Sequence, residues 1–268
     1  IKNLAILSSY ISILITNGFG FSVVIVSVFF FLIPTLTIDT SSDDSISNHK
    51  KLKKIIPVLF ILFLILIKNI FYSYLADIYF AKYESNNSRQ EYQLAYQDIL
   101  TTVSFRPNEP NYLINLSIAA AKMAILTKDQ TYIDQSIKSS TKAIEISPAN
   151  INYLKQQAQA YYYLATLDSK YLINTIESML QANKLAPTDA KILYSTGQFL
   201  ESAQLLDDAI YYYQQAVELK PNYDHAYFAL GKIYYDQKKY DLAKKNLELN
   251  LKYAPTNTEA QEMLKKIN

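Results

Sequence analysis

The fold is decided by two consecutive stretches of equal length, PTDAKILYSTGQFLESAQLLDDAIYYYQQAVELK (187–220) and PNYDHAYFALGKIYYDQKKYDLAKKNLELNLKYA (221–254). Proline recurs every 34 residues, at Pro187, Pro221 and Pro255, and Gly197 and Gly231 keep the same interval. Because proline cannot continue a helix, each of the three is expected to end one. A fixed interval of this length indicates a structural unit that recurs along the chain.

A period of 34 residues is typical of the tetratricopeptide repeat, in which two antiparallel helices form one unit and successive units stack into a solenoid. We therefore predict an all-α chain whose residues 83–268 form such a solenoid and end in a capping helix. Two earlier units, 110–148 and 151–187, exceed the period. We place their extra residues in the turns between the paired helices, near residues 127–130 and 166–170.

The repeat type predicts an inner, concave face that comes mainly from the first helix of each unit. The corresponding positions carry aromatic rings, side-chain amides and lysines, which suit an extended peptide, or else a glycan, by stacking and hydrogen bonding. The candidate binding residues are Asn152, Lys155, Gln159, Tyr162, Lys191, Tyr194, Gln198, Glu201, His225, Phe228, Lys232 and Tyr235. The alternative is that they are solvated or pack on neighbouring helices. Lys155 stands at one position of the carboxylate clamp found in some of these repeats, but Gln159 replaces the asparagine and no arginine follows, so we predict no clamp.

The chain offers little for catalysis. It has no cysteine, and its two histidines, His49 and His225, lack the spacing of metal ligands. It contains no nucleophile elbow, phosphate loop or metalloprotease motif. The net charge of +2 and the presence of only two arginines argue against a nucleic-acid partner. We therefore predict no catalytic residue, no metal site, no cofactor and no nucleic-acid partner for this chain.

Residues 1–38 are typical of a segment that lies in a bilayer, because no charged residue occurs between Leu4 and Ile38. One span needs about 20 apolar residues, so this run suits two short transmembrane helices with a break at NGFG (17–20). The alternative is one span with a re-entrant or interfacial piece. Membrane lipid is therefore an expected partner.

A polar, lysine-rich loop follows at residues 39–54, with four lysines within residues 50–54. The positive-inside rule places this loop in the cytoplasm, whereas the alternative is that the lysines reach whichever headgroups are nearest. Residues 55–82 then form a further transmembrane helix that continues into the repeats. We expect a protein integral to the cytoplasmic membrane, with its repeats outside the cytoplasm.

Three short stretches point to a known family: NGFGFSVV (17–24), FFFLIP (29–34) and LADIYFAK (75–82). Together with the repeats, they resemble the C-terminal end of bacterial O-antigen ligase/polymerase-type membrane proteins that carry a tetratricopeptide tail. The resemblance implies a polytopic glycosyltransferase that moves a lipid-linked glycan onto an acceptor outside the cytoplasm, with its catalytic residues upstream of this segment. Since the chain begins with Ile1, we expect its true start to lie upstream as well. The alternative is a stand-alone, membrane-tethered scaffold for an envelope complex, without enzymatic activity.

Overall fold

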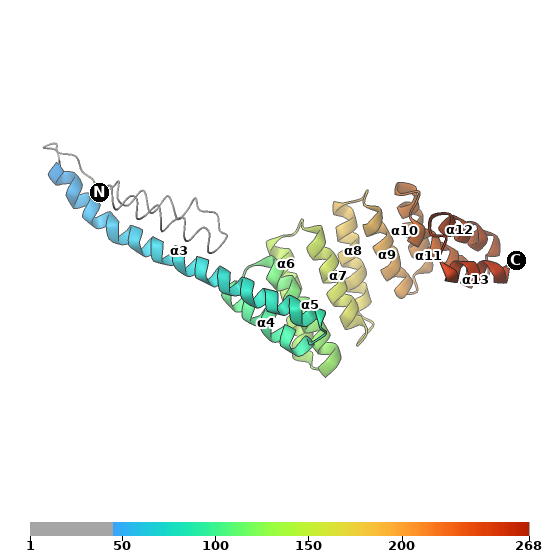
Figure 1. Ribbon diagram of the computed structural model, residues 1–268, viewed down its shortest axis with the longest axis horizontal. Helices are drawn as coiled ribbons and strands as arrows, with labels where there is room; N and C mark the ends of the chain where they lie inside the picture. Colours follow the sequence, from blue (N-terminus) through green and yellow to red (C-terminus); the bar gives the residue numbers. More distant parts are fainter. Residues whose placement is uncertain (1–44, 268) are drawn as a thin grey trace. The chain divides into compact units, whose positions relative to one another are not determined.

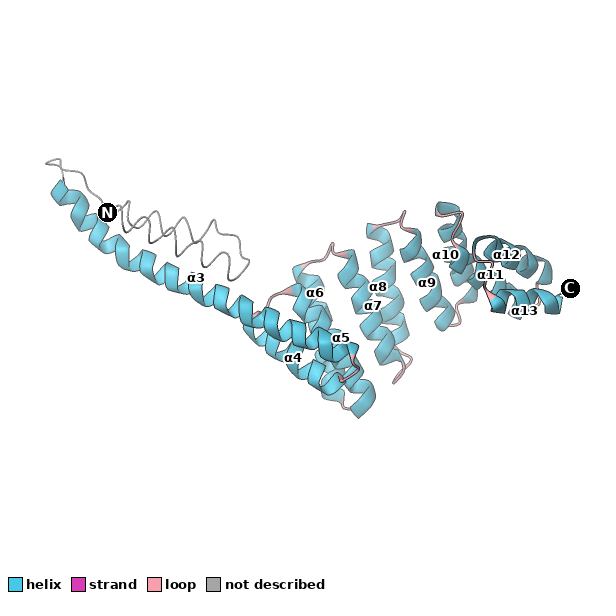
Figure 2. Cartoon of the chain, viewed as in Figure 1, coloured by secondary structure: helices cyan, strands magenta, loops and turns pink. Residues whose placement is uncertain are grey.

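The structure, a computed structural model, describes residues 45–267, and these residues form helices joined by short turns (Figure 1, Figure 2). No strand occurs within this range, so the predicted all-α class is confirmed for it. The helices are α3 (Ser45–Ser88), α4 (Tyr92–Phe105), α5 (Pro110–Thr127), α6 (Gln130–Ile146), α7 (Ile151–Ala165), α8 (Tyr171–Leu185), α9 (Ala190–Ser202), α10 (Leu206–Leu219), α11 (Asp224–Asp236), α12 (Tyr240–Tyr253) and α13 (Thr258–Ile267). The two spans predicted in residues 1–38, and residues 39–44 of the predicted loop, lie outside the described residues.

The chain divides into two compact units, Ile1–Tyr74 and Leu75–Asn268, and α3 contributes residues to both. α3 begins at Ser45, so the second half of the predicted loop, residues 45–54, is helical and the loop prediction is wrong there. That stretch contains no glycine or proline to stop a helix, and lysine is a good helix former.

α3 also carries the apolar segment that we predicted to cross a membrane. In the part of the chain that the structure describes, Phe60–Ser88 is the one helical segment long and apolar enough to do so, with a mean hydropathy of 1.7. Large apolar side chains such as Phe60 and Phe71 are more than half exposed on it.

In the second unit the helices pair in chain order, α5 with α6, α7 with α8, α9 with α10, and α11 with α12 (Figure 1). Each pair contacts the next one through α5–α7, α8–α9 and α10–α11, and α13 packs on α12. The end of α3 joins this stack, because Tyr83 lies in one buried cluster with Ile99 of α4 and Leu116 of α5. The predicted solenoid of helix pairs is therefore confirmed for the second unit.

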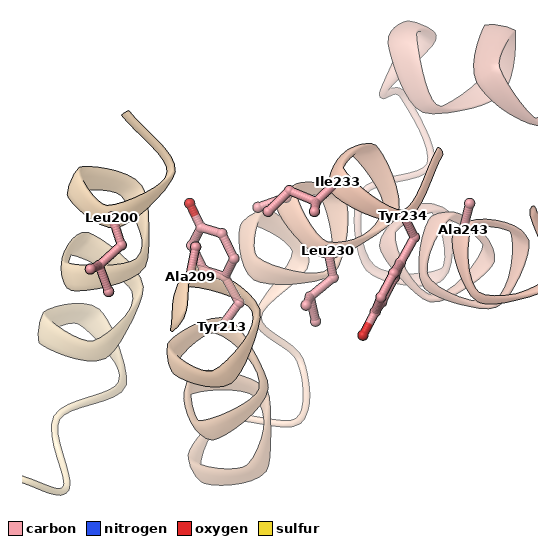
Figure 3. Close-up of a cluster of buried hydrophobic side chains, with 8 residues drawn as sticks. Leu200, Ala209, Tyr213, Leu230, Ile233, Tyr234 and Ala243 are labelled. Atoms are coloured by element: carbon pink, nitrogen blue, oxygen red, sulfur yellow. The ribbon is translucent and has the colours of Figure 1, made fainter. Parts of the chain in front are cut away.

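Glycine recurs in the middle of the first helices because two paired helices approach closely there. A methyl group at Gly197 would lie 2.6 Å from the ring of Tyr213, and one at Gly231 would lie 2.8 Å from the Leu247 side chain. Tyr213 is fully buried. Figure 3 shows the cluster to which it belongs, together with Leu200 of α9 and with Leu230 and Ile233 of α11. The 34-residue interval of the glycines thus reflects close packing of α9 on α10 and of α11 on α12.

The longer units hold their extra residues partly in the helices. α5 and α6 have 18 and 17 residues, whereas α9 and α10 have 13 and 14. The insertion predicted near residues 127–130 is wrong, because Lys128 ends α5 in the left-handed conformation at φ 58° and Asp129 already caps α6. Between α7 and α8, the turn at residues 166–170 lies where we placed the insertion, and both helices have 15 residues.

Candidate binding groove

A groove of about 580 Å³ lies between α7 and α9. Five of the twelve predicted binding residues line it, namely Asn152, Lys155, Gln159 and Tyr162 of α7 and Gln198 of α9. The lining residues that the sequence prediction missed are Gln156, Tyr163, Met179, Ser195, Phe199 and Ser202. Several of them are sequence neighbours of a predicted residue, as Gln156 is of Lys155. The prediction took only about one position from each turn of the inner helices, and the groove is lined by more than that.

Two helix caps and a buried cluster set the orientation of α7 and α9. The Asn150 side chain accepts hydrogen bonds from the backbone N–H groups of Asn152 and Tyr153, at 3.0 and 3.3 Å. The Asp189 side chain accepts one from the backbone N–H of Lys191 at 2.8 Å. Such caps satisfy amide groups that have no partner within a helix. α7 is also held by apolar packing, because its Leu154 and Ala158 lie in a buried cluster with Met179, Ala182 and Ile192.

Side-chain amides supply most of the polar groups in the groove. Gln159 Nε2 donates to Tyr163 Oη at 3.2 Å, and Gln198 Nε2 donates to Tyr194 Oη at 3.2 Å. Each amide has a second N–H donor and an acceptor oxygen beyond that bond. A pair of donors and acceptors of this kind matches the N–H and C=O groups of an extended backbone.

Aromatic rings provide the apolar part of the groove. Tyr162 of α7 and Phe199 of α9 meet edge to face, with ring centroids 5.3 Å apart and planes at 61°. Tyr162 keeps 37% of its surface exposed, so its ring remains available to a ligand. Aromatic rings with one free face suit stacking against peptide side chains, peptide planes or sugar rings.

The groove carries a positive charge that no lining residue neutralises. Lys155 is the only charged side chain among the eleven lining residues, and none of them is a carboxylate. An anionic group on a ligand would therefore meet a cation there without like-charge repulsion from the lining.

Three of the predicted residues on α9 lie outside this lining. Lys191 is exposed, whereas Tyr194 is half-buried, with its ring centroid 5.5 Å from that of Tyr213 and 5.1 Å from that of Tyr223. Glu201 accepts a hydrogen bond of 2.7 Å from Tyr213 Oη. Burial, and then this bond to a carboxylate, raise the pKa of Tyr213 well above its usual range. Tyr194 and Glu201 therefore have partners within the solenoid.

The predicted residues on α11 also lie apart from the groove lining. Phe228 and Tyr235 pack against the cluster of Leu247, Ala260 and Met263, which joins α12 to α13. His225 and Lys232 are exposed. The twelve predicted positions thus do not form one continuous lining, and for Phe228 and Tyr235 the structure gives the alternative role of packing on neighbouring helices.

No group of three or more His, Asp or Glu side chains that could hold a metal ion occurs within the described residues. The hydrogen-bonding groups of the groove are amides, hydroxyls and one ammonium. Such groups can form hydrogen bonds, stacking contacts and one charge interaction with a ligand.

Comparison with known proteins agrees with the fold. Residues 191–238 match the family model of the TPR repeat, the tetratricopeptide repeat. A comparison with curated proteins gave no match. The chain has a TPR-like helical solenoid, and solved structures of several TPR proteins are similar to it.

Among these solved structures, pilF of Pseudomonas aeruginosa has a TM-score of 0.54 at 13% identity, over 73% of this chain and 84% of that one. A thermophilic TPR protein of Thermus thermophilus has a TM-score of 0.50 at 15% identity, over 72% and 98% of the two chains. YrrB, described as a TPR protein with an unusual peptide-binding site, has a TM-score of 0.50 at 14% identity, over 70% and 90%.

Proposed function

We propose that this chain is a membrane-anchored interaction module whose groove between α7 and α9 binds an extended peptide of a partner protein. The observation that carries the proposal is the groove itself, where Gln159, Gln198 and Tyr162 converge from two helices. The chemistry of these residues supports a peptide, because two amides at the walls can pair with a main chain while an exposed ring holds a side chain. The peptide-binding site named for YrrB gives a precedent on a similar fold.

Peptide binding is testable with a displayed library of random dodecapeptides and the full chain immobilised in detergent micelles. We expect Tyr162→Ala to abolish recovery of the peptides that the unaltered chain selects. The matched control is Tyr211→Ala, since Tyr211 is 56% exposed on α10 and lies outside the groove lining. If both variants recover the selected peptides equally well, the peptides bind outside the groove between α7 and α9. Binding of glycans but not peptides to the same groove, on a glycan array, would replace the peptide with a sugar ligand.

The membrane anchor in this proposal is supported by α3. Its exposed apolar side chains between Phe60 and Phe71 match the hydrocarbon of a bilayer. Lys68 Nζ lies 5.3 Å from the ring centroid of Tyr72, a pairing that suits the interface at the end of a span. We place residues 39–54 in the cytoplasm and the solenoid outside it.

Sidedness is testable because the chain has no cysteine of its own. The thiol of a Ser45→Cys variant is expected to be shielded from a membrane-impermeant reagent in intact cells, and that of a Ser202→Cys variant is expected to react. Ser202 is exposed on α9, so burial in the solenoid does not protect it. The reverse labelling pattern would invert the topology.

The resemblance to O-antigen ligase-type proteins gives a second, more specific candidate, in which this chain is the accessory tail of a glycan ligase. Its supporting observation is that LADIYFAK (75–82) lies in α3, where the apolar segment meets the solenoid. The gene upstream of the Ile1 codon tests it. Several further apolar segments and a long polar loop with arginine and histidine would support the ligase, whereas a start codon close to Ile1 would leave the stand-alone scaffold.

A further inference from the structure

Lys122 of α5 is half-buried, and within the described residues its ammonium contacts one side-chain amide and two aromatic rings. Its Nζ donates a hydrogen bond of 2.7 Å to Asn87 Oδ1 at the end of α3. The same Nζ lies 4.8 Å from the ring centroid of Tyr92 and 5.9 Å from that of Tyr163. The protein groups around the ammonium are therefore two aromatic rings and one amide.

In the part of the chain that the structure describes, no carboxylate forms an ion pair with the Lys122 ammonium. Burial lowers the pKa of Lys122. A partly desolvated ammonium costs free energy unless a counter-charge or strong hydrogen bonds offset it. Cation–π contacts and one amide bond offset part of that cost and hold the ammonium in place. An incoming carboxylate would supply the missing counter-charge.

Tyr163 connects Lys122 with the groove between α7 and α9. Its ring faces the Lys122 ammonium, its hydroxyl accepts the hydrogen bond from Gln159, and it lines the groove. Lys155 lies one helical turn before Gln159 on α7 and lines the same groove. Lys122 is not itself a lining residue, but its contact with Tyr163 places it beside the groove that Lys155 lines. None of the eleven lining residues is a carboxylate.

Building on the proposed peptide-binding function, we infer that the partner segment is acidic, with one Asp or Glu side chain at Lys122 and a second at Lys155. The main chain of the peptide runs over Tyr163 and pairs with the amides of Gln159 and Gln198. The positions of the two lysines select for carboxylates within the peptide, so a free C-terminus is not required. Charge complementarity of this kind decides which partner binds and how fast it does so.

The inference is tested with peptides from the same dodecapeptide library, followed by one selected sequence made with both ends capped. Selected peptides are expected to be enriched in Asp and Glu. The capped peptide is expected to bind on the order of tenfold more tightly than its counterpart with Gln for each Glu, because hydrogen bonds to charged groups are the stronger ones. Raising the salt concentration should narrow that difference.

Variants of the chain test whether Lys122 causes the preference for Glu over Gln in the peptide. Lys122→Gln is expected to reduce the Glu-over-Gln preference to within about twofold, and Lys122→Arg to preserve it, because only the arginine keeps the charge. Lys138→Gln is the matched control, since Lys138 is exposed on α6 and its replacement removes an equal charge outside the groove. Thermal unfolding of each variant tests whether the solenoid remains intact.

Two outcomes would overturn the inference and they are distinguishable. If Glu and Gln peptides bind equally well and Tyr162→Ala still abolishes their binding, the acid preference is wrong and the peptide-binding function stands. If no library peptide depends on Tyr162, the peptide-binding function is wrong and the acidic partner fails with it.

Discussion

Gly231 and Leu247 meet where α11 packs on α12, and a methyl group on the glycine would lie 2.8 Å from the leucine side chain. We predict that Gly231→Ala lowers the free energy of unfolding by about 1–3 kcal/mol, the usual effect of overpacking a core. This loss is expected although alanine favours a helix by about 1 kcal/mol over glycine. Chemical denaturation followed by circular dichroism measures the change.

Leu247→Ala provides the control for that close approach. On its own it is expected to cost about 2–5 kcal/mol, because Leu247 is fully buried and its removal leaves a cavity. In the double variant the new methyl group of residue 231 has room. The double variant should therefore lose less unfolding free energy than the sum of the losses of the two single variants. Strict additivity would show that the glycine is not required for packing.

Tyr213 links stability to alkaline pH. Burial and the hydrogen bond to Glu201 raise its pKa above the usual value of 10.0, so the folded state keeps a proton that the unfolded chain releases. Its stabilising contribution is therefore fully present below pH 10 and is lost as pH rises further, by about 1.4 kcal/mol per pH unit. Tyr213→Phe removes this titration, and the slope of unfolding free energy against pH should become shallower, by about half a proton at pH 10 and by nearly one proton at pH 11. An unchanged slope would contradict the assignment.

The start of α7 positions one wall of the groove, and Asn150 holds it. Because Asn150 accepts hydrogen bonds from the N–H groups of Asn152 and Tyr153, Asn150→Ala is expected to destabilise the protein by about 1 kcal/mol. Peptide affinity should fall as well, because Asn152 lines the groove. Asn150→Asp retains a capping oxygen and should preserve both properties. Chemical denaturation measures the stability of the two variants, and peptide titration measures their affinity. If Asn150→Ala and Asn150→Asp do not differ in either property, the cap is not needed.

The helix pairs could be predicted from sequence because proline and glycine mark backbone events with a fixed spacing. Pro187 marks the end of a helix, and Gly197 marks a point where two helices pack closely. Each of these features requires that particular type of residue. The lengths of α5 and α6 could not be predicted in this way, because the tight turn at Lys128 and Asp129 carries neither residue. The repeat register could place Tyr162 and Gln198 on the inner helices.

The same register could not tell which inner positions are covered. Phe228 and Tyr235 occupy positions equivalent to groove residues, yet they pack on the cluster that joins α12 to α13. Glu201 likewise occupies such a position and is held by Tyr213. Whether a side chain at a repeat position faces a ligand depends on which neighbouring helices pack against it, and periodicity alone does not contain that information.

The solenoid as a whole should respond locally to damage, because each helix pair contacts mainly the pairs beside it. We predict that Leu247→Ala speeds amide hydrogen exchange in α11, α12 and α13 and leaves α5 and α6 as protected as before. The groove between α7 and α9 lies in earlier pairs, so peptide affinity should change by less than about twofold. Hydrogen exchange read by mass spectrometry on the full chain in micelles measures both regions at once. Equal acceleration in α5 and α12 would instead mean that the pairs unfold as one cooperative body, and binding in the groove would then depend on every pair of the solenoid.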